Sequence, residues 1–282
     1  MNSEPLIGNI SDTARWVAVF RARENERPNP LFRDPYARQL AGTRGEQIAA
    51  NLGYARTHEW AYITRTYLFN QYIERAVNAG ADAVVNLACG LDTRPYTMQL
   101  PSSLKWVEVD LPGILDYKEE ILRNEKPRCS LERVRLDLSN LAGRRALFTR
   151  IGQQSKNVLI ISEGLITYLS AEEVASLGTD LAAQATFRNW ATDLCSPGLL
   201  KRLQRGVGTQ LEAAGAPLKF GPPEGPDFFV RCGWKVSEVH SMLHTAARLK
   251  RLPWFMRLFA LFPEQNGAQG PRPWSGALLL ER

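Results

Sequence analysis

A glycine and an acidic residue, spaced as in nucleotide-binding folds, are the first candidates for chemistry. Gly90 lies in the turn Ala88–Thr93 after an apolar run, and Asp110 ends the next alternating segment, 20 positions further on. A glycine turn before a helix offers backbone N–H groups to a ligand, and a carboxylate at this distance can accept hydrogen bonds from two ribose hydroxyls. The spacing predicts a nucleotide-type cofactor, although a buried strand–helix–strand unit without a ligand fits the same pattern.

Four stretches of the chain carry a family resemblance. The segments LACGLDTR, EVDLP followed by Lys118, VRLDLSN and SEGLITYLS together resemble the leucine carboxyl methyltransferase family and its bacterial relatives, from about Asp12 to the carboxyl end. The resemblance implies S-adenosyl-L-methionine (SAM) as cofactor and methyl transfer as reaction. The turn departs from the family's more usual Gly-Ala-Gly, because this chain has Ala88-Cys89-Gly90.

The resemblance also assigns the cofactor contacts. The expected cofactor-binding residues are Arg65, Ala88, Gly90, Asp110, Leu111, Asp137, Leu138, Glu163 and Gly164. Asp110 is expected at the ribose, Asp137 and Leu138 at the adenine, Glu163 at the sulfonium and the ammonium group, and Arg65 at the tail carboxylate. The alternatives are a helix cap for Asp110, a turn aspartate for Asp137, and surface roles for Arg65 and Glu163.

Three residues are expected on the acceptor side of the site. Tyr168 follows the fourth strand and is the candidate catalytic residue, with a core position as the alternative. Arg94 lies nearer in sequence to the glycine turn but is less uniform in the family, so the resemblance assigns it to the substrate, with a surface arginine as the alternative. Arg21 is also assigned to the acceptor side. Relatives share Arg21 and the turn FRDPYARQLAG, and both are expected to fix a helical cap over the pocket.

The acceptor is predicted to be a carboxylate on a small molecule or a peptide. The protein would then be an O-methyltransferase. The relatives imply a role in secondary metabolism. A carboxylate is a nucleophile at neutral pH without a general base, whereas a phenol or alcohol needs one nearby. The chain has only three histidines, His58, His240 and His244, and none lies in the family motifs. The alternatives are a hydroxyl acceptor, a nicotinamide-dependent oxidoreductase, and a protein that binds SAM without turnover.

Alternating segments predict the elements that position these residues. Strands are expected at Ala83–Leu87, Lys105–Asp110, Leu131–Asp137, Asn157–Glu163, Asn189–Cys195, Gly233–His240 and Ser275–Arg282, with helices near 112–124, 139–151, 171–184 and 197–213. This alternation predicts an α/β fold with a doubly wound, mostly parallel seven-stranded sheet. An antiparallel last strand would make it the class I SAM methyltransferase type, an expectation that rests on fold analogy.

The first 80 residues are predicted to form a helical cap. Asp34 is expected to cap a helix that begins at Pro35 and ends at Gly42, and a longer helix is expected from Thr57 to Asn78. We therefore expect one domain, 1–282, with a cofactor-binding core at 81–214. A lid segment and the antiparallel strands would occupy 215–282.

Composition limits the other classes of function. The chain has 282 residues, 44% of them hydrophobic, a formal charge of +6, and 4 cysteines spaced too widely for a zinc site or a disulfide framework. We expect a cytoplasmic protein with no metal, no nucleic-acid partner and no membrane span. The basic amphipathic segment 248–262 could bind a membrane surface or a hydrophobic substrate, or simply pack as a helix.

Overall fold

A seven-stranded sheet in the order β3-β2-β1-β4-β5-β7-β6 forms the centre of the computed structural model, which describes residues 7–8, 11–51, 53–263 and 270–282. β1 to β5 pair in parallel, and β7 is antiparallel to both β5 and β6. The strands are β1 (Ala83–Leu87), β2 (Lys105–Asp110), β3 (Ser130–Arg135), β4 (Val158–Ser162), β5 (Phe187–Cys195), β6 (Lys235–Ser241) and β7 (Ser275–Glu281). The expected fold class and the antiparallel last strand are confirmed.

Helices cover both faces of this sheet. They are α4 (Arg94–Thr97), α5 (Pro112–Leu122), α6 (Leu141–Gln154), α7 (Ala171–Ala182) and α10 (Met242–Arg248), together with α3 (Gly53–Asn78). One face packs on α6 and α7, the other on α3 and α10. Every residue of β1 and β4 is buried, as their apolar sequences predict for central strands. Ser170 and Glu173 form the capping box that starts α7.

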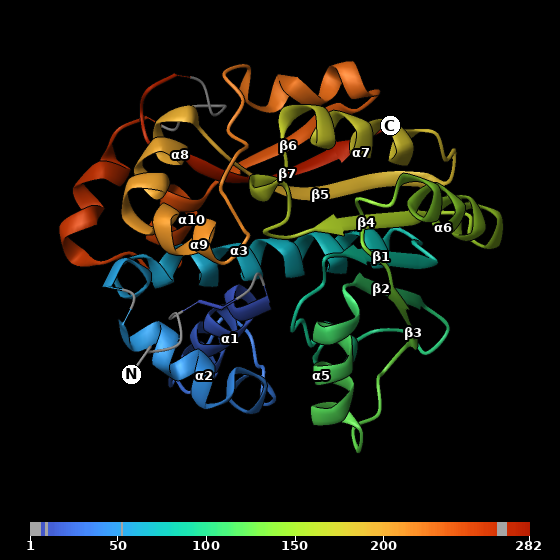
Figure 1. Cartoon of the computed structure of the whole chain (residues 1–282), viewed down its shortest axis with the longest axis horizontal. Helices are drawn as coiled ribbons and strands as arrows, with labels where there is room; N and C mark the ends of the chain where they lie inside the picture. The colour runs from blue at the N-terminus through green and yellow to red at the C-terminus, as the bar shows by residue number, and fades with distance from the viewer. Residues whose placement is uncertain (1–6, 9–10, 52, 264–269) are drawn as a thin grey trace.

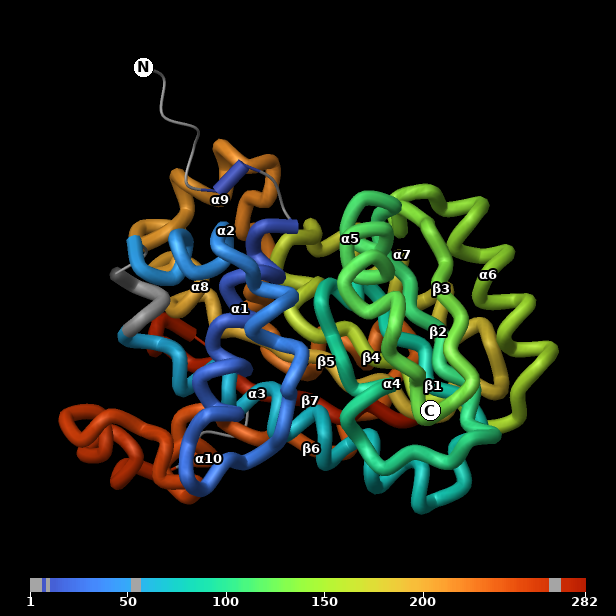
Figure 2. The backbone as a smooth tube through the Cα atoms, turned by 90° about the horizontal axis from the view of Figure 1, so that it is seen from below, coloured from blue at the N-terminus to red at the C-terminus, as the bar shows by residue number. Residues whose placement is uncertain are grey.

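Two groups of helices lie beyond the carboxyl ends of the parallel strands. α1 (Ser11–Asn25) and α2 (Ala37–Asn51) come from the amino-terminal region, and α8 (Pro197–Leu203), a π-helix η2 (Gln204–Gly208) and α9 (Thr209–Ala213) follow β5. In Figure 1 the arrow of β4 points toward both groups, and Figure 2 shows α1 and α2 beside α8 and α9. Buried side chains of both groups share one apolar cluster. α1 and α2 lie where the helical cap was predicted, whereas α3, which was expected to belong to the cap, packs mainly on a face of the sheet.

The expected Asp34 cap of the second helix is wrong, whereas the expected end at Gly42 corresponds to a break inside α2 (Ala37–Asn51), where Gly42 has non-helical backbone angles. The Asp34 carboxylate does not cap a helix but accepts a hydrogen bond of 2.8 Å from Arg21 Nε. α2 begins at Ala37 and continues to Asn51 through a kink at Gly42, where φ is +60°. The Arg21 guanidinium binds one of the two Asp34 oxygens, and this contact with a residue 13 positions away cannot be read from local sequence.

The remaining elements are short. They are the 3₁₀ helices η1 (Ile166–Tyr168), η3 (Gly225–Cys232) and η4 (Trp254–Leu261). The stretch expected to act as a lid touches η1, because Lys219 N donates to Thr167 O at 2.8 Å. Among the described residues, no helix is long and apolar enough to cross a membrane.

Candidate functional site

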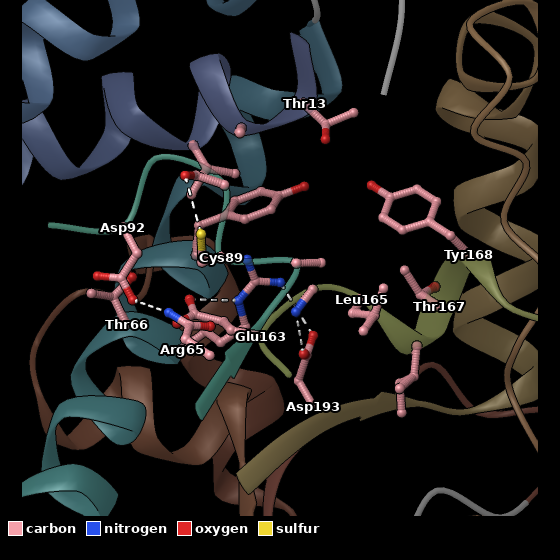
Figure 3. Close-up of a pocket in the computed structure, with 18 of the residues that line it drawn as sticks. Thr13, Arg65, Thr66, Cys89, Asp92, Glu163, Leu165, Thr167, Tyr168 and Asp193 are labelled. Atoms are coloured by element: carbon pink, nitrogen blue, oxygen red, sulfur yellow. Dashed lines mark hydrogen bonds and ion pairs between the residues drawn. The ribbon is translucent and has the colours of Figure 1, made fainter. Parts of the chain in front are cut away.

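A cavity of about 1140 Å³ lies at the carboxyl edge of the sheet. Its walls come from α1 and α3, the glycine turn, the segments after β2 to β5, and residues 215–220. Single-ligand pockets are commonly about 300–1,000 Å³. The cavity can therefore hold a cofactor and an acceptor side by side, and Figure 3 shows part of its lining.

The glycine turn approaches the cap closely. Gly90 has φ +51°, and a Cβ atom built there would lie 3.1 Å from the Ala14 Cβ on α1. Ala88 also has φ +51°, which costs a residue with a side chain about 1–2 kcal/mol. Ala88 therefore keeps a backbone conformation that the family's usual glycine would adopt without strain.

Asp110 lies beside this turn, as its spacing predicts. Its two carboxylate oxygens accept hydrogen bonds from Gly90 N at 2.6 Å and from Leu111 N at 2.8 Å. Burial raises the pKa of the Asp110 carboxyl, while these two N–H groups act in the opposite direction. Each carboxylate oxygen can accept a second hydrogen bond, so Asp110 still has acceptor capacity for a diol.

Arg65, from the middle of α3, lies between two carboxylates. Its Nε is 3.1 Å from Glu163 Oε1 and its Nη1 is 3.2 Å from Asp193 Oδ2, as Figure 3 shows. Gly164 follows with φ +72°, and a Cβ there would lie 3.1 Å from Arg65 Nη1. Glycine at 164 thus lets the guanidinium lie against the main chain.

A second arginine completes this network. Arg94 Nη2 is 2.7 Å from Glu163 Oε2, and its Nη1 is 2.7 Å from Asp92 Oδ2. Arg94 is buried and also donates to Asn70 Oδ1 at 2.7 Å. Arg94 is therefore not a surface arginine, and since most of its N–H groups bind the protein itself, it positions Glu163. Contact of Arg94 with the substrate stays a prediction.

The charges of this network are stable over a wide pH range. Burial alone would raise the pKa of Glu163, but Arg94 and Arg65 outweigh it and hold this pKa below its usual range. The pKa of Asp92 is lowered in the same way, mainly by Arg94. Burial opposes the charged form of Arg65, but Asp193 and Glu163 together raise its pKa. Glu163, Asp92 and Arg65 therefore stay charged at neutral pH.

Tyr168 ends η1 and lines the cavity, and its ring is drawn at the right of Figure 3. Burial raises the pKa of its hydroxyl, although a side-chain hydrogen bond with Thr13 and the charge of Arg65 oppose the shift. The phenol therefore stays protonated at neutral pH and can donate a hydrogen bond.

The adenine-side residues lie at a more open end of the cavity. Asp137 and Leu138 follow β3 and line the pocket. Asp137 Oδ1 accepts from Ser139 N at 2.8 Å, so the carboxylate also stabilises its own turn. The predicted adenine contact and the turn role are compatible, since a carboxylate has several acceptor positions.

Arg21 joins the cap to the glycine turn. Besides its ion pair with Asp34, its Nη2 donates to Leu91 O at 2.6 Å. Both bonds fix α1 over the turn, in keeping with the expectation that this region fixes the cap. Direct contact with an acceptor stays a prediction.

The sequence analysis missed Asp193. It lies near the end of β5, and its Oδ1 accepts from Gly164 N at 2.6 Å. Burial raises the pKa of its carboxyl, while Arg65 and the Gly164 N–H oppose that shift. Its place at the carboxyl end of a parallel strand was the signal that could have identified it. Among the described residues, no group of three or more His, Cys, Asp or Glu side chains could hold a metal ion.

Comparisons with known proteins identify the family of the chain. The model of the leucine carboxyl methyltransferase family matches residues 14–182. A protein of Frankia alni, whose name describes a SAM-dependent methyltransferase, is 31% identical over 85% of this chain and 88% of its own length. A protein of Parafrankia with the same description is 30% identical over 93% of this chain and 88% of its own length.

Solved structures show the same fold. A DUF574 family protein from Streptomyces avermitilis superposes with a TM-score of 0.61 at 13% identity, covering 96% of this chain and 97% of that one. A protein from Thermobifida fusca described as a methyltransferase gives a TM-score of 0.57 at 15% identity, covering 98% and 96%. Together with the match of the family model, these findings show that the chain belongs to the leucine carboxyl methyltransferase family and is a SAM-dependent methyltransferase.

Proposed function

We propose that this enzyme transfers the methyl group to a carboxylate oxygen of a small or peptide-borne acceptor and so forms a methyl ester. The observation that carries the proposal is the state of the ionisable groups around Arg65. Glu163, Asp92 and Asp193 are held by arginines, and Tyr168 has a raised pKa. The lowered pKa values of Glu163 and Asp92 make these two carboxylates weak bases, and Asp193, whose pKa is raised by burial, is held in an ion pair with Arg65. A carboxylate acceptor needs no base.

Arg65 and Glu163 would bind the amino-acid tail of SAM through their opposite charges. The two side chains lie 3.1 Å apart and present a cation beside an anion. This arrangement complements the carboxylate and ammonium groups of an amino-acid tail, with bidentate binding available from the guanidinium. Asp110 and Leu111 would hold the ribose, and Asp137 and Leu138 the adenine.

When bound, SAM supplies an electrophilic methyl group on a sulfonium sulfur. The protein has to align an acceptor oxygen with the methyl carbon and the sulfur, and to exclude water. Arg65 and Glu163 would fix the amino-acid tail of the cofactor and so the position of its sulfur. Tyr168 would donate a hydrogen bond to the acceptor. An oxygen–carbon bond forms, the carbon–sulfur bond breaks, and no proton moves.

The acceptor side of the cavity is largely apolar. It is formed by Trp16, Val17, Leu199, Leu203, Val207 and Leu211 from α1, α8, η2 and α9. We therefore expect the acceptor to combine its carboxylate with an apolar body. We also propose that the enzyme acts in secondary metabolism, and identification of the acceptors that it methylates tests this.

Replacing Asp110 with alanine should weaken SAM binding by about 1–3 kcal/mol, because hydrogen bonds to a charged acceptor are lost. Titration calorimetry with SAM measures the change, and circular dichroism checks the fold. Asp116→Ala is the matched control, since Asp116 lies on α5 with an exposed side chain paired to Arg135. Equal affinity of wild type and Asp110→Ala would remove Asp110 from the cofactor site.

The acceptor proposal predicts a methyl-transfer rate that is nearly flat from about pH 6 to 9, because a carboxylate is ionised well below neutrality. A phenol with a pKa of about 10 should instead give a rate that rises with pH. The assay uses methyl-labelled SAM with candidate acids that carry apolar groups.

The product gives an independent test of the acceptor. A methyl ester releases labelled methanol in mild alkali, whereas an aryl ether is stable. Alkali-stable label would refute the carboxylate acceptor and favour a hydroxyl acceptor, with His58 as candidate base because it lines the cavity. The SAM-dependent activity itself would be unaffected by that outcome.

A further inference from the structure

A group of large apolar side chains lies on the surface at η4, away from the cavity. The group, called the η4 patch here, consists of Trp254, Phe255, Leu258, Phe259, Leu261 and Phe262, which are 52–80% exposed. Elsewhere in the described chain, the exposed large apolar residues are only Leu141 and Val230. A contiguous apolar surface of this kind is typical of an interaction site.

η4 is docked on the protein by its other side. Met256 and Ala260 pack against the cluster that contains Trp60 and Ala246. Contacts fix the chain on both sides of η4. Before it, Arg251 Nη2 is 2.7 Å from Oε1 of the buried Glu24, and after it, Phe262 O lies 2.9 Å from His244 Nε2. The patch therefore lies on a helix whose position is fixed by contacts with the rest of the protein.

The segment that carries the patch is basic, and Glu264 follows it directly in the sequence. Residues 241–263 contain Arg248, Lys250, Arg251 and Arg257 and no acidic residue. Arg248, Lys250 and Arg257 are exposed. Figures 1 and 2 both place the orange-red segment that follows α10 at the periphery of the molecule, where a flat surface could reach it.

We propose that the η4 patch binds the surface of a lipid bilayer that carries anionic headgroups. Aromatic and aliphatic side chains would enter the boundary between headgroups and acyl chains, where tryptophan and phenylalanine are favoured. Arg248, Lys250 and Arg257 would meet lipid phosphates. The enzyme would then lie on a membrane without spanning it.

The same charges argue against a second copy of the chain as the occupant. A twofold interface brings the same surface from both copies together. Arg248, Lys250 and Arg257 of one copy would then face the same residues of the other. Like charges disfavour that contact, whereas anionic lipid complements them.

Sedimentation of the full chain with vesicles tests the proposal. One set of vesicles contains phosphatidylglycerol and phosphatidylcholine in equal parts, and the other phosphatidylcholine alone. We expect a partition coefficient about tenfold higher or more on the anionic set, since each basic residue near such a surface contributes about fivefold. Added salt should weaken this binding.

Two sets of variants separate the apolar from the charged contribution. The triple variant Trp254→Ser, Leu258→Ser, Phe259→Ser and the double variant Lys250→Glu, Arg257→Glu should each lower binding by about tenfold or more. The controls are Val230→Ser for the triple variant and Arg123→Glu with Lys235→Glu for the double variant, because these residues are also exposed but lie outside the patch. Affinity for S-adenosylhomocysteine (SAH), the demethylated cofactor, verifies that every variant is folded.

Three results would overturn the proposal. They are equal partition onto both kinds of vesicle, equal loss of binding in the control variants, and no binding to anionic vesicles. A dimer that the triple variant abolishes, found by analytical ultracentrifugation without vesicle binding, would instead assign the patch to a second copy.

Discussion

Replacing Gly90 with valine is expected to lower the affinity for SAM on the order of 100-fold. The residue has φ +51°, which a β-branched side chain adopts only under strain, and a Cβ atom would lie 3.1 Å from Ala14. The side chain would either fill the space for the cofactor or push the turn away from α1. Titration calorimetry with SAM and SAH measures the loss.

Gly113→Val is the matched control for this prediction. Gly113 belongs to α5, close to the same edge of the sheet, and an added Cβ meets no atom within 4 Å. Its cofactor affinity should stay within about threefold of the wild type, well under 1 kcal/mol. If Gly90→Val binds SAM as well as Gly113→Val does, with both folds intact by circular dichroism, then the glycine turn is not part of the cofactor site.

Replacing Arg65 with methionine should have the largest effect on stability. The change leaves Glu163 and Asp193 without the cation that lies 3.1 and 3.2 Å away. Loss of one partner from a buried ion pair costs about 3–5 kcal/mol, and the partial exposure of these side chains favours the lower value, about 3 kcal/mol. This corresponds to a fall in Tm of roughly 6–12 °C, measurable by calorimetry.

Arg75→Met provides a control on the same helix. Arg75 forms an ion pair with Glu238 at 2.8 Å, but its side chain is 52% exposed, so its loss should cost at most about 1 kcal/mol. Arg65→Met should also weaken SAH binding by about tenfold or more, as expected if Arg65 binds the tail carboxylate, whereas Arg75→Met should not. Equal destabilisation by the two variants would contradict the special role of the Arg65 network.

The sequence predicted where Gly90 and Asp110 lie in the fold, because local patterns specify the strands that carry them. β1 and β2 have the predicted bounds, Ala83–Leu87 and Lys105–Asp110. An unbroken apolar run identifies a central strand, and the order of strands places their carboxyl ends at one edge. For that reason Gly90 and Asp110 could be placed beside each other before the structure was known.

The partners of the charged residues could not be predicted. Arg65 and Asp193 are 128 positions apart in the chain, and neither side chain carries a local signal of the other. Arg94 likewise has the sequence context of a substrate residue, but the fold buries it between Asp92 and Glu163. Such pairs depend on which side chains a folded sheet edge and its cap bring within hydrogen-bond distance.

The sequence by itself therefore determined the class of fold and, through its family motifs, the cofactor, whereas the contact of the Gly90 turn with that cofactor stays a prediction. Periodicity, strand order and glycine positions are properties of neighbouring residues. Only the tertiary structure decided that Asp34 binds Arg21, that Asp193 joins Arg65, and that η4 docks through Met256 while Trp254 stays exposed. In each case, groups that are distant in the sequence compete for contact with a buried charge or an apolar surface. Packing in three dimensions determines which group makes that contact.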